Sequence, residues 1–300
     1  MNYLKKFCVD PGSKVDLAKV DAGFKDKHES HEHALPEIES YAQKLHDQQY
    51  LMYAEGKRSL LICLQGRDAA GKDGTINHVL GAMNPQGCTV TGFKVPSKEE
   101  AAHDFLWRYH QHTPGKGQVA IFNRSHYEDV LVVRVHDLVP KKVWSQRYEQ
   151  INAFERMLAD NGTHILKFYL HIDPDEQLER FKQRILDPAR HWKISDGDYA
   201  ERPYWDAYTE AFEDALNKTS TEHAPWFVIP SNHKWFRNLA ISRIVAETLK
   251  SLDMQFPEPT VDIEAIKQKY HDIVAAEGQA PPAGGKKGKK KKKGKKGDKK

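Results

Sequence analysis

One segment combines glycines, a lysine and two aspartates at a spacing suited to phosphate chemistry. It reads Gly66-Arg67-Asp68-Ala69-Ala70-Gly71-Lys72-Asp73-Gly74, directly after an apolar run and directly before a helix-like one. Glycines let a tight loop turn its backbone N–H groups onto phosphate oxygens, and the following helix N-terminus adds partial positive charge. Strand, glycine-rich loop and helix in this order are the context that a GxxxxGK motif requires. The segment predicts a P-loop whose phosphate-binding residues are Gly66, Ala69, Ala70, Gly71, Lys72, Asp73 and Gly74.

The charged side chains of this loop have separate expected roles. Lys72 can reach phosphate oxygens as a mobile point charge. Asp68 would face incoming phosphates, where an acid is costly unless it binds a cation or takes a proton from an attacking oxygen; the alternative is a loop-shaping Asx turn. Asp73 replaces the usual Ser or Thr and is a stronger Mg²⁺ ligand, although it could instead only cap the helix. Asp68 and Lys72 are therefore candidate catalytic residues, and Asp68 and Asp73 are candidate metal ligands.

A second polar set follows the apolar run 119–123. Ligands bind beyond the carboxyl ends of strands in open parallel sheets, and Asn123 and Arg124 lie at this end. P-loop enzymes place their Walker B acid here, whereas this chain has Asn123, with Glu128 about a helical turn later. The planar fork of Arg124 can hold two oxygens of a transferring phosphoryl group, which makes it the third candidate catalytic residue. We expect His126 to pack, because this reaction needs charge and positioning more than proton removal.

A basic segment further along the chain has the features of a lid. A helix is predicted from Asp173-Pro174, and it carries Arg180 and Arg184 on one face. The proline-broken loop that follows adds further basic residues up to Lys193. Such a segment can fold over a polyanion and exclude water, so we expect a lid at about residues 180–200, with Arg180, Arg184 and Lys193 binding phosphate. The alternative is a solvated, charged helix end.

These sites require a scaffold that aligns several strand ends. Short apolar runs alternate with helical patterns, which is typical of a parallel sheet with helices on both faces. The predicted fold is therefore α/β, with three layers in the P-loop kinase arrangement, a central parallel sheet and a helical lid. The predicted strands are 59–65, 89–95, 119–123, 165–172 and 226–230, and helical spacing also covers 33–55 before the first strand.

Composition excludes several classes of protein. A chain of 300 residues with 39% hydrophobic content can bury one sizeable core. Cys8, Cys63 and Cys88 are widely spaced, which argues against a disulfide framework or a zinc site and suits a reducing compartment. No apolar run approaches the roughly 20 residues of a membrane span, and the first residues lack a signal-peptide core. We expect a cytoplasmic protein with no membrane partner.

The net charge is unevenly distributed. Residues 278–300 hold eleven Lys and one Asp, so this tail carries +10, whereas the whole chain carries only +4. The tail has almost no apolar residues, which predicts disorder. It could tether polyanions, with nucleic acid as one option, or it could simply keep the protein soluble. We divide the chain into an N-terminal extension (1–32), a kinase domain (33–257), a C-terminal helix (258–277) and the tail (278–300).

The motifs resemble those of the polyphosphate kinase 2 family of P-loop kinases over roughly residues 10–257. The resemblance rests on GRDAAGKDGTI, NPQG, FKVPS, FNRSHYEDVLVVRV, NGTHILKFYLHI and STEHAPWFVIP. GxDxxGKxG followed by NRSHYE is not a general P-loop pattern. The family implies reversible phosphoryl transfer between inorganic polyphosphate and a nucleotide, with Mg²⁺ (or Mn²⁺ in its place), a helical lid and a homo-oligomer, dimer or tetramer.

The resemblance also assigns residues. Asp68, Lys72 and Asp73 match the Walker A loop of the family, Asn123 and Arg124 its Walker B segment, and Arg184 a basic position of the lid. In the family the acid matching Asp68 orients or deprotonates the acceptor phosphate. Glu128 is similar to a residue of members that accept monophosphates as well as diphosphates, whereas Gly66-Arg67 differs from the Ala-Met of those members. The implied nucleotide-binding residues are Asp68, Asn123, Arg124 and Glu128.

Three functions are consistent with these features. The first is transfer from polyphosphate to nucleoside diphosphates, with purines such as ADP and GDP favoured and monophosphates as further acceptors. The second is an ATP-dependent nucleotide kinase, which would need an adenine site for its donor, and no motif supplies one. The third is a protein that binds polyphosphate or nucleic acid through its tail without catalysis. Turnover after deletion of the tail separates the third from the others.

Overall fold

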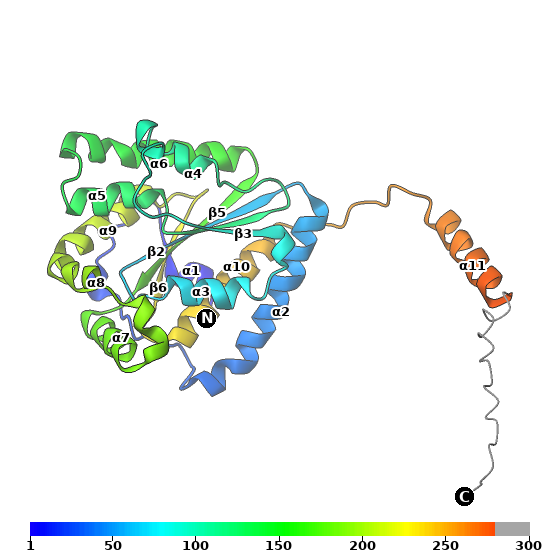
Figure 1. Ribbon diagram of the computed structural model, residues 1–300, viewed down its shortest axis with the longest axis horizontal. Helices are drawn as coiled ribbons and strands as arrows, with labels where there is room; N and C mark the ends of the chain where they lie inside the picture. The colour runs from blue at the N-terminus through cyan, green and yellow to red at the C-terminus, as the bar shows by residue number, and fades with distance from the viewer. Residues whose placement is uncertain (280–300) are drawn as a thin grey trace, which may run out of the picture. The chain divides into compact units, whose positions relative to one another are not determined.

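One six-stranded sheet forms the centre of the computed structural model, which describes residues 1–279 (Figure 1). The strand order is β1-β6-β5-β2-β4-β3, and every neighbouring pair is parallel except β1 and β6. The predicted α/β fold is confirmed, and all five predicted strands are present. The strands are β1 (Cys8–Val9), β2 (Ser59–Gly66), β3 (Cys88–Gly92), β4 (Val119–Asn123), β5 (Thr163–His171) and β6 (Trp226–Pro230).

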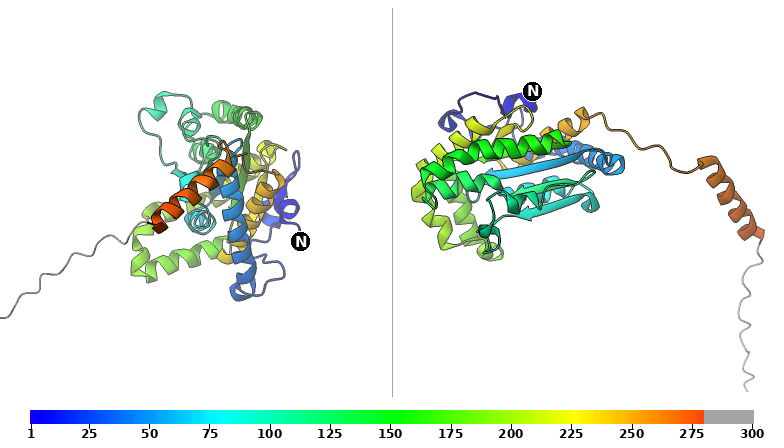
Figure 2. Two further views of the ribbon diagram at one scale, coloured as in Figure 1. Left: turned by 90° about the vertical axis from the view of Figure 1, so that its right-hand side faces the viewer. Right: turned by 90° about the horizontal axis from the view of Figure 1, so that it is seen from above.

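Helices cover both faces of this sheet, as Figures 1 and 2 show. The α-helices are α1 (Tyr3–Phe7), α2 (His31–Glu55), α3 (Lys72–Leu80), α4 (Trp107–His110), α5 (Val132–Val135), α6 (Lys141–Asp160), α7 (Pro174–Leu186), α8 (Asp196–Ala200), α9 (Trp205–Thr219), α10 (Lys234–Ser251) and α11 (Ile263–Gln279). Short 3₁₀ helices are η1 (Leu17–Lys19), η2 (Pro85–Gly87), η3 (Glu100–Ala102), η4 (His126–Val130), η5 (Pro188–Lys193) and η6 (Arg202–Tyr204).

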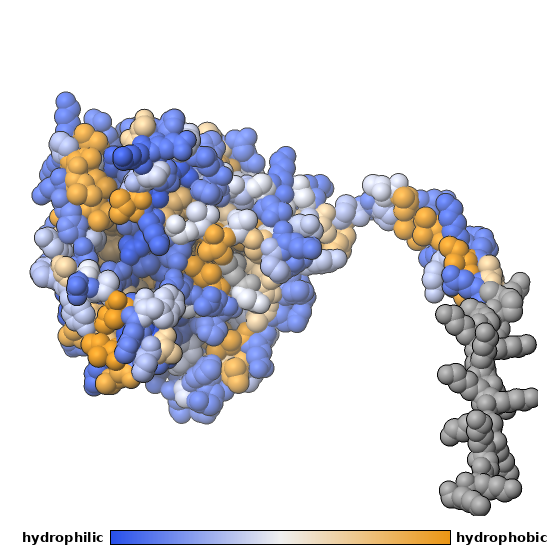
Figure 3. All heavy atoms as spheres, in the orientation of Figure 1, coloured by the Kyte–Doolittle hydropathy of each residue, from blue (hydrophilic) through white to orange (hydrophobic). Residues whose placement is uncertain are grey.

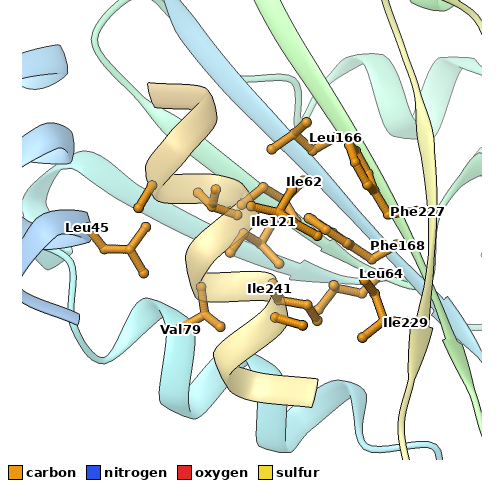
Figure 4. Packing of buried hydrophobic residues seen from close by; sticks show 14 of the residues in the cluster. Leu45, Ile62, Leu64, Val79, Ile121, Leu166, Phe168, Phe227, Ile229 and Ile241 are labelled. Atoms are coloured by element: carbon orange, nitrogen blue, oxygen red, sulfur yellow. The ribbon is translucent and has the colours of Figure 1, made fainter. Parts of the chain in front are cut away.

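The sheet separates two apolar layers. On one face, Ile62 and Phe168 pack in a cluster with Leu45 of α2, Val79 of α3 and Ile241 of α10 (Figure 4). On the other face, alternate residues of the same strands pack against α6 and α9. All eight residues of β2 are buried, which explains why its sequence is a continuous apolar run.

The register of the central strands positions the predicted site. Leu64 of β2 lies beside Asn123 of β4, so both strands end at the same edge of the sheet. The P-loop leaves β2 at Gly66, and Arg124 follows β4 directly. Two loops that are far apart in the sequence therefore meet.

Residues 1–32, expected to be an extension, lie within the compact unit and contribute several residues to its core. Cys8 and Val9 form β1 and pair with β6, and the buried rings of Tyr3 and Phe7 contact Phe236 of α10. Two residues are too short a run to be recognised as a strand from alternation alone. The predicted strand 89–95 is shorter in the structure and ends at Gly92.

The chain divides into a compact unit, Met1–Phe256, and a second unit that begins at Pro257. Within the second unit, α11 exposes Ile266, Tyr270 and Ile273 at helical spacing. Figure 3 shows hydrophobic residues on the surface of this helix. The predicted tail, 278–300, lies almost entirely outside the described residues. Among residues 1–279, no helix is long and apolar enough to cross a membrane.

Candidate active site

The P-loop backbone is shaped by glycine at one position above all. Gly71 has φ +107°, and a Cβ built there would lie 1.7 Å from Nη1 of the Arg237 guanidinium. Any side chain would therefore collide with a buried cation in a conformation that L-residues rarely adopt. Helix α3 begins at Lys72, so its N-terminus faces the loop.

Lys72 lies inside the curve of the loop. Its ammonium donates to the carbonyl oxygens of Gly66 at 2.7 Å and Arg67 at 3.2 Å. Burial lowers the pKa of Lys72 to about 8, and the positive charge of Arg124 adds to this shift. Among the described residues no carboxylate forms a salt bridge with it, so Lys72 offers its charge to a bound anion.

Asp68, Arg124 and Glu128 form a charged row. Nη2 of Arg124 lies 2.7 Å from Oδ1 of Asp68, and Nη1 lies 3.4 Å from Oε2 of Glu128. The backbone of Arg124 has φ +62°, an uncommon left-handed conformation for a residue other than glycine. The structure thus brings the predicted catalytic arginine between two of the predicted acidic residues.

Asp73 meets Asn123 on the other side of the loop. Nδ2 of Asn123 donates to Oδ1 of Asp73 at 2.9 Å. Both residues line the same cavity beside the P-loop, and the Asp73 side chain is exposed there. Residues 1–279 contain no group of three or more His, Cys, Asp or Glu able to hold a metal alone. One or two carboxylates that share Mg²⁺ with substrate phosphates are the usual arrangement for this ion, and Asp73 fits it.

Two cavities open beside the loop. The larger, about 570 Å³, is lined mainly by basic residues and the P-loop, and the smaller, about 40 Å³, has aromatic and acidic walls. Asp68 and Arg124 line both cavities, so this ion pair marks where they meet. The smaller cavity is lined by Gly66, Arg67, Asp68, Arg124, Glu128, Leu131, Gln177, Glu201, Arg202, Trp205, Tyr208 and Phe212.

Most predicted phosphate-binding residues line the larger cavity, namely Ala69, Gly71, Lys72, Asp73, Gly74, Arg124, Arg180, Arg184 and Lys193. Asp68 and Asn123, predicted to bind the nucleotide, line it as well. Gly66 and Glu128 line the smaller cavity instead. Ala70 lines neither, because it is fully buried and its carbonyl oxygen accepts from Arg180 and Arg237.

The contacts of Arg180 differ from the expectation of a free phosphate-binding side chain. Its guanidinium is 4% exposed, lies against Glu176, and donates to the carbonyl oxygens of Ala69 and Ala70, and also to those of Ser231 and Asn232. Each guanidinium nitrogen thus has a protein acceptor. Arg180 therefore supports the backbone of the P-loop through its hydrogen bonds to Ala69 and Ala70. The spacing of residues in the sequence could not distinguish this supporting position from one that faces a bound phosphate.

Arg184 and Lys193 lie at the predicted lid. Nη1 of Arg184 donates to the Lys193 carbonyl oxygen at 2.9 Å and lies 3.5 Å from the Asp198 carboxylate. Arg184 therefore links the end of α7 to η5 and α8. The Lys193 ammonium lies 4.9 Å from the centroid of the exposed Trp192 ring. This segment follows the predicted order of helix and broken loop, and the structure adds the short helix α8 after them.

Sequence reasoning missed two groups of residues. Lys234 and Arg237 of α10 line the larger cavity, and burial, with the nearby Arg180 charge, lowers the pKa of Arg237 to about 9. They follow β6 as Arg124 follows β4, so the same rule about strand ends could have found them. In the smaller cavity, the Arg67 guanidinium lies 3.8 Å from the Trp205 ring centroid. No motif signals that contact, since the two residues are 138 positions apart.

Comparison with known proteins decides the family. The family model of polyphosphate kinase 2 (PPK2) matches residues 27–257 of this chain. The chain belongs to the polyphosphate kinase 2 family. An "AMP/ADP-polyphosphate phosphotransferase" of Meiothermus ruber is 49% identical over 264 residues, which cover 88% of this chain and 99% of the relative. An "ADP-polyphosphate phosphotransferase" of Rhodopseudomonas palustris is 44% identical and covers 85% of this chain and 93% of the relative.

The fold agrees with a solved structure of the polyphosphate kinase 2 family. Polyphosphate kinase 2 from Arthrobacter aurescens TC1 aligns with a TM-score of 0.87 and 39% identity, covering 91% of this chain and 97% of that one. The predicted family is thereby confirmed.

Proposed function

We propose that this protein transfers a phosphoryl group, reversibly and with Mg²⁺, between inorganic polyphosphate and purine nucleotides, with ADP and GDP as favoured acceptors. The observation that carries the proposal is the meeting of a basic and an aromatic cavity at Asp68 and Arg124. A phosphotransferase needs donor and acceptor phosphates in line at one point, because its catalysis is mostly positioning and charge stabilisation.

The larger cavity suits the polyphosphate donor. Eight Arg or Lys side chains line it besides the P-loop lysine, and one of them, Arg124, lies at the junction of the two cavities. They are Lys94, Arg124, Arg180, Arg184, Arg190, Lys193, Lys234 and Arg237. A linear polyanion gains from a row of cations, whereas a nucleoside would find few apolar surfaces there.

The smaller cavity suits the nucleoside of the acceptor. Trp205, Tyr208 and Phe212 supply flat apolar surfaces, and Glu201 and Gln177 supply hydrogen-bonding groups. Its volume of about 40 Å³ admits only a few waters, so the side chains that line it must move apart before a base can enter. Arg67, stacked on Trp205, is one of three arginines that line this cavity.

The chemistry follows from the position of each side chain. The acceptor's terminal phosphate oxygen attacks the terminal phosphorus of polyphosphate, a new P–O bond forms, and the P–O bond to the shortened chain breaks. Arg124 leaves the Asp68 carboxylate and stabilises the transferring group, while Lys72 holds donor oxygens. Asp68, once released, orients the acceptor phosphate or accepts its proton. Asp73 and Asp68 would hold Mg²⁺, which would supply positive charge against the phosphate oxygens.

Acceptor range and cellular context are also part of the proposal. The relative in Meiothermus ruber is named for AMP and ADP, and the one in Rhodopseudomonas palustris for ADP alone. We place diphosphates first and monophosphates second. Glu128, which is similar to a residue of monophosphate-accepting members, lines the acceptor cavity, but so does Arg67, at which this chain differs from those members. Three unpaired cysteines suit the cytoplasm. We also propose a homo-oligomer, in line with the family.

An acceptor panel tests this function. Purified protein is incubated with ADP, GDP, AMP or GMP, each with polyphosphate and Mg²⁺, and the nucleotides are separated afterwards. We expect ATP and GTP from the diphosphates, slower product from the monophosphates, and none after chelation of the metal. The Lys72→Ala variant, checked for folding by thermal melting, controls for a contaminating kinase. Triphosphate formation that continues without polyphosphate would contradict the proposal.

A further inference from the structure

A fully buried charged network lies directly behind the Arg124 segment. Glu155 of α6 and Lys167 of β5 are both 0% exposed, and Nζ of Lys167 lies 2.6 Å from Oε2 of Glu155. Taking two charges out of water is costly, and apolar residues at such positions are often as stable. Stabilisation of the sheet alone therefore does not explain why the chain has a buried ion pair at this position.

The Glu155 carboxylate holds two consecutive residues of η4. Its Oε1 accepts from Nε2 of His126 at 3.0 Å and from Oη of Tyr127 at 2.8 Å. Both side chains are 0% exposed. The expectation that His126 packs rather than reacts agrees with this burial. One carboxylate thus ties the turn after β4 to α6.

Lys167 completes the network from the sheet. Its ammonium donates to Glu155, to Oη of Tyr127 at 2.9 Å and to the Thr219 carbonyl oxygen at 2.7 Å, so all three protons are used. Burial alone would raise the pKa of the Glu155 carboxyl, but Lys167 and His126 hold it below its ordinary value. The carboxylate is therefore ionised and can hold all three donors.

The residue that these anchors flank is Arg124. Its own N–H donates to the Leu64 carbonyl oxygen at 3.1 Å, and the next residue, Ser125, accepts from Nε2 of Gln65 at 3.2 Å. His126 and Tyr127 are then fixed by Glu155. A left-handed arginine persists only where its surroundings over-determine it, and here contacts on both sides do so.

We infer that Glu155 is a positioning residue for the phosphoryl-transfer reaction, acting through His126 and Tyr127 to hold Arg124 in its left-handed conformation between the two cavities. The inference rests on the proposed function, because it concerns the rate of that reaction. Glu155 lies in the buried layer between α6 and β5 and lines neither cavity, so it touches no substrate. Its contribution must pass through the backbone of the Arg124 turn.

A double-mutant cycle on turnover tests this inference. Glu155→Gln keeps the shape of the side chain but removes the charge that holds three donors. In the wild-type background we expect kcat to fall at least about tenfold, with the nucleotide KM changing less than about threefold. In the Arg124→Lys background the same change should cost less than about threefold, because the guanidinium it positions is already gone.

Two controls separate positioning from folding. The paired variant Glu155→Gln/Lys167→Met leaves no unpaired buried charge, and we expect its melting temperature to exceed that of Glu155→Gln while its kcat stays at least about tenfold below wild type. Leu45→Ala opens a cavity in the core at a residue that lines neither cavity of the site, and it should lower the melting temperature without that loss of kcat.

The results that would overturn the inference are specific. An equal loss from Glu155→Gln in both backgrounds, or a paired variant whose turnover recovers together with its stability, would reduce the network to a structural role. If Glu155→Gln does not fold, the paired variant is tested in both backgrounds instead. The cycle compares the turnover of variants with that of an active wild type and so tests the role of Glu155. A wild type without activity would instead contradict the proposed function.

Discussion

The Arg124 guanidinium lies 2.7 Å from the Asp68 carboxylate, at the point where the basic and the aromatic cavity meet. Without substrate, each ion neutralises the other. Under the proposed function, polyphosphate and nucleotide phosphates compete with Asp68 for Arg124, so binding of the substrates would release the Asp68 carboxylate. This exchange connects the P-loop of β2 with the turn after β4.

Asp68→Asn tests whether the released carboxylate takes part in the reaction. The two side chains have nearly the same shape, so the change tests charge. We expect kcat to fall at least about 100-fold, the usual lower range for a lost acid–base or metal-orienting group, with nucleotide binding nearly unchanged. Steady-state rates across a Mg²⁺ series provide the measurement. A loss below about fivefold would leave Asp68 with a loop-shaping role only, since Asn makes the same turn.

The pKa of Lys72 predicts a pH dependence. Because burial lowers this pKa to about 8, Lys72 of the free enzyme is charged below that pH and loses its proton above it. kcat/KM for polyphosphate, which reports the free enzyme, should therefore be level below about pH 8 and decline above it. kcat should decline only at higher pH, because bound phosphate holds the proton. A kcat/KM that stays level to pH 9.5 would count against Lys72 as the phosphate-binding cation.

The same shift predicts a trend in stability. The folded-state pKa of Lys72 lies below the ordinary value of 10.5, so folding expels a proton between about pH 8 and 10.5. The stability linked to this group is present above about pH 10.5 and is lost as the pH falls toward 8. Polyphosphate supplies the missing counter-charge, so it should raise the melting temperature more at pH 7 than at pH 9. Thermal melts at both pH values, at one ionic strength, check this.

Gly71→Ala should disable the P-loop. A Cβ there would lie 1.7 Å from Arg237, and the backbone φ of +107° is strained for alanine, so the loop must move. We expect at least about a 100-fold loss of kcat/KM for polyphosphate. Gly74→Ala is the matched control, because its Cβ would meet only the end of the Arg237 side chain at 3.0 Å and its backbone is not left-handed. Equal effects of both changes would contradict this account of Gly71.

Much of this site could be predicted from the sequence because its key residues directly follow strands. Asp68, Lys72, Asn123 and Arg124 come from two segments whose parallel strands are adjacent, and the register of β2 and β4 brings them together. The sequence pattern around each strand end was therefore sufficient to predict these site residues. Four of the five predicted strands, β2, β4, β5 and β6, were found because buried parallel strands are continuous apolar runs. The fifth, β3, is largely exposed.

The remaining features depend on contacts between distant segments. Arg180 was expected at the open lid but lies behind the loop, because a helical face shows spacing and not which neighbour it meets. The stack of Arg67 on Trp205 joins the P-loop to α9, and Glu155 joins α6 to the turn after β4. None of these pairs is marked by a motif. The short β1 became visible only through its pairing with β6.

The central claim is that the donor and the acceptor occupy different cavities that meet at Asp68 and Arg124, and a crossed measurement of KM tests it most directly. Lys234→Ala changes only the larger cavity, and Trp205→Leu only the smaller one. We predict that Lys234→Ala raises the KM for polyphosphate at least about threefold and leaves that for ADP within about twofold, and that Trp205→Leu does the reverse. If each variant raises both KM values by the same factor, the two substrates do not occupy separate cavities and the account is wrong.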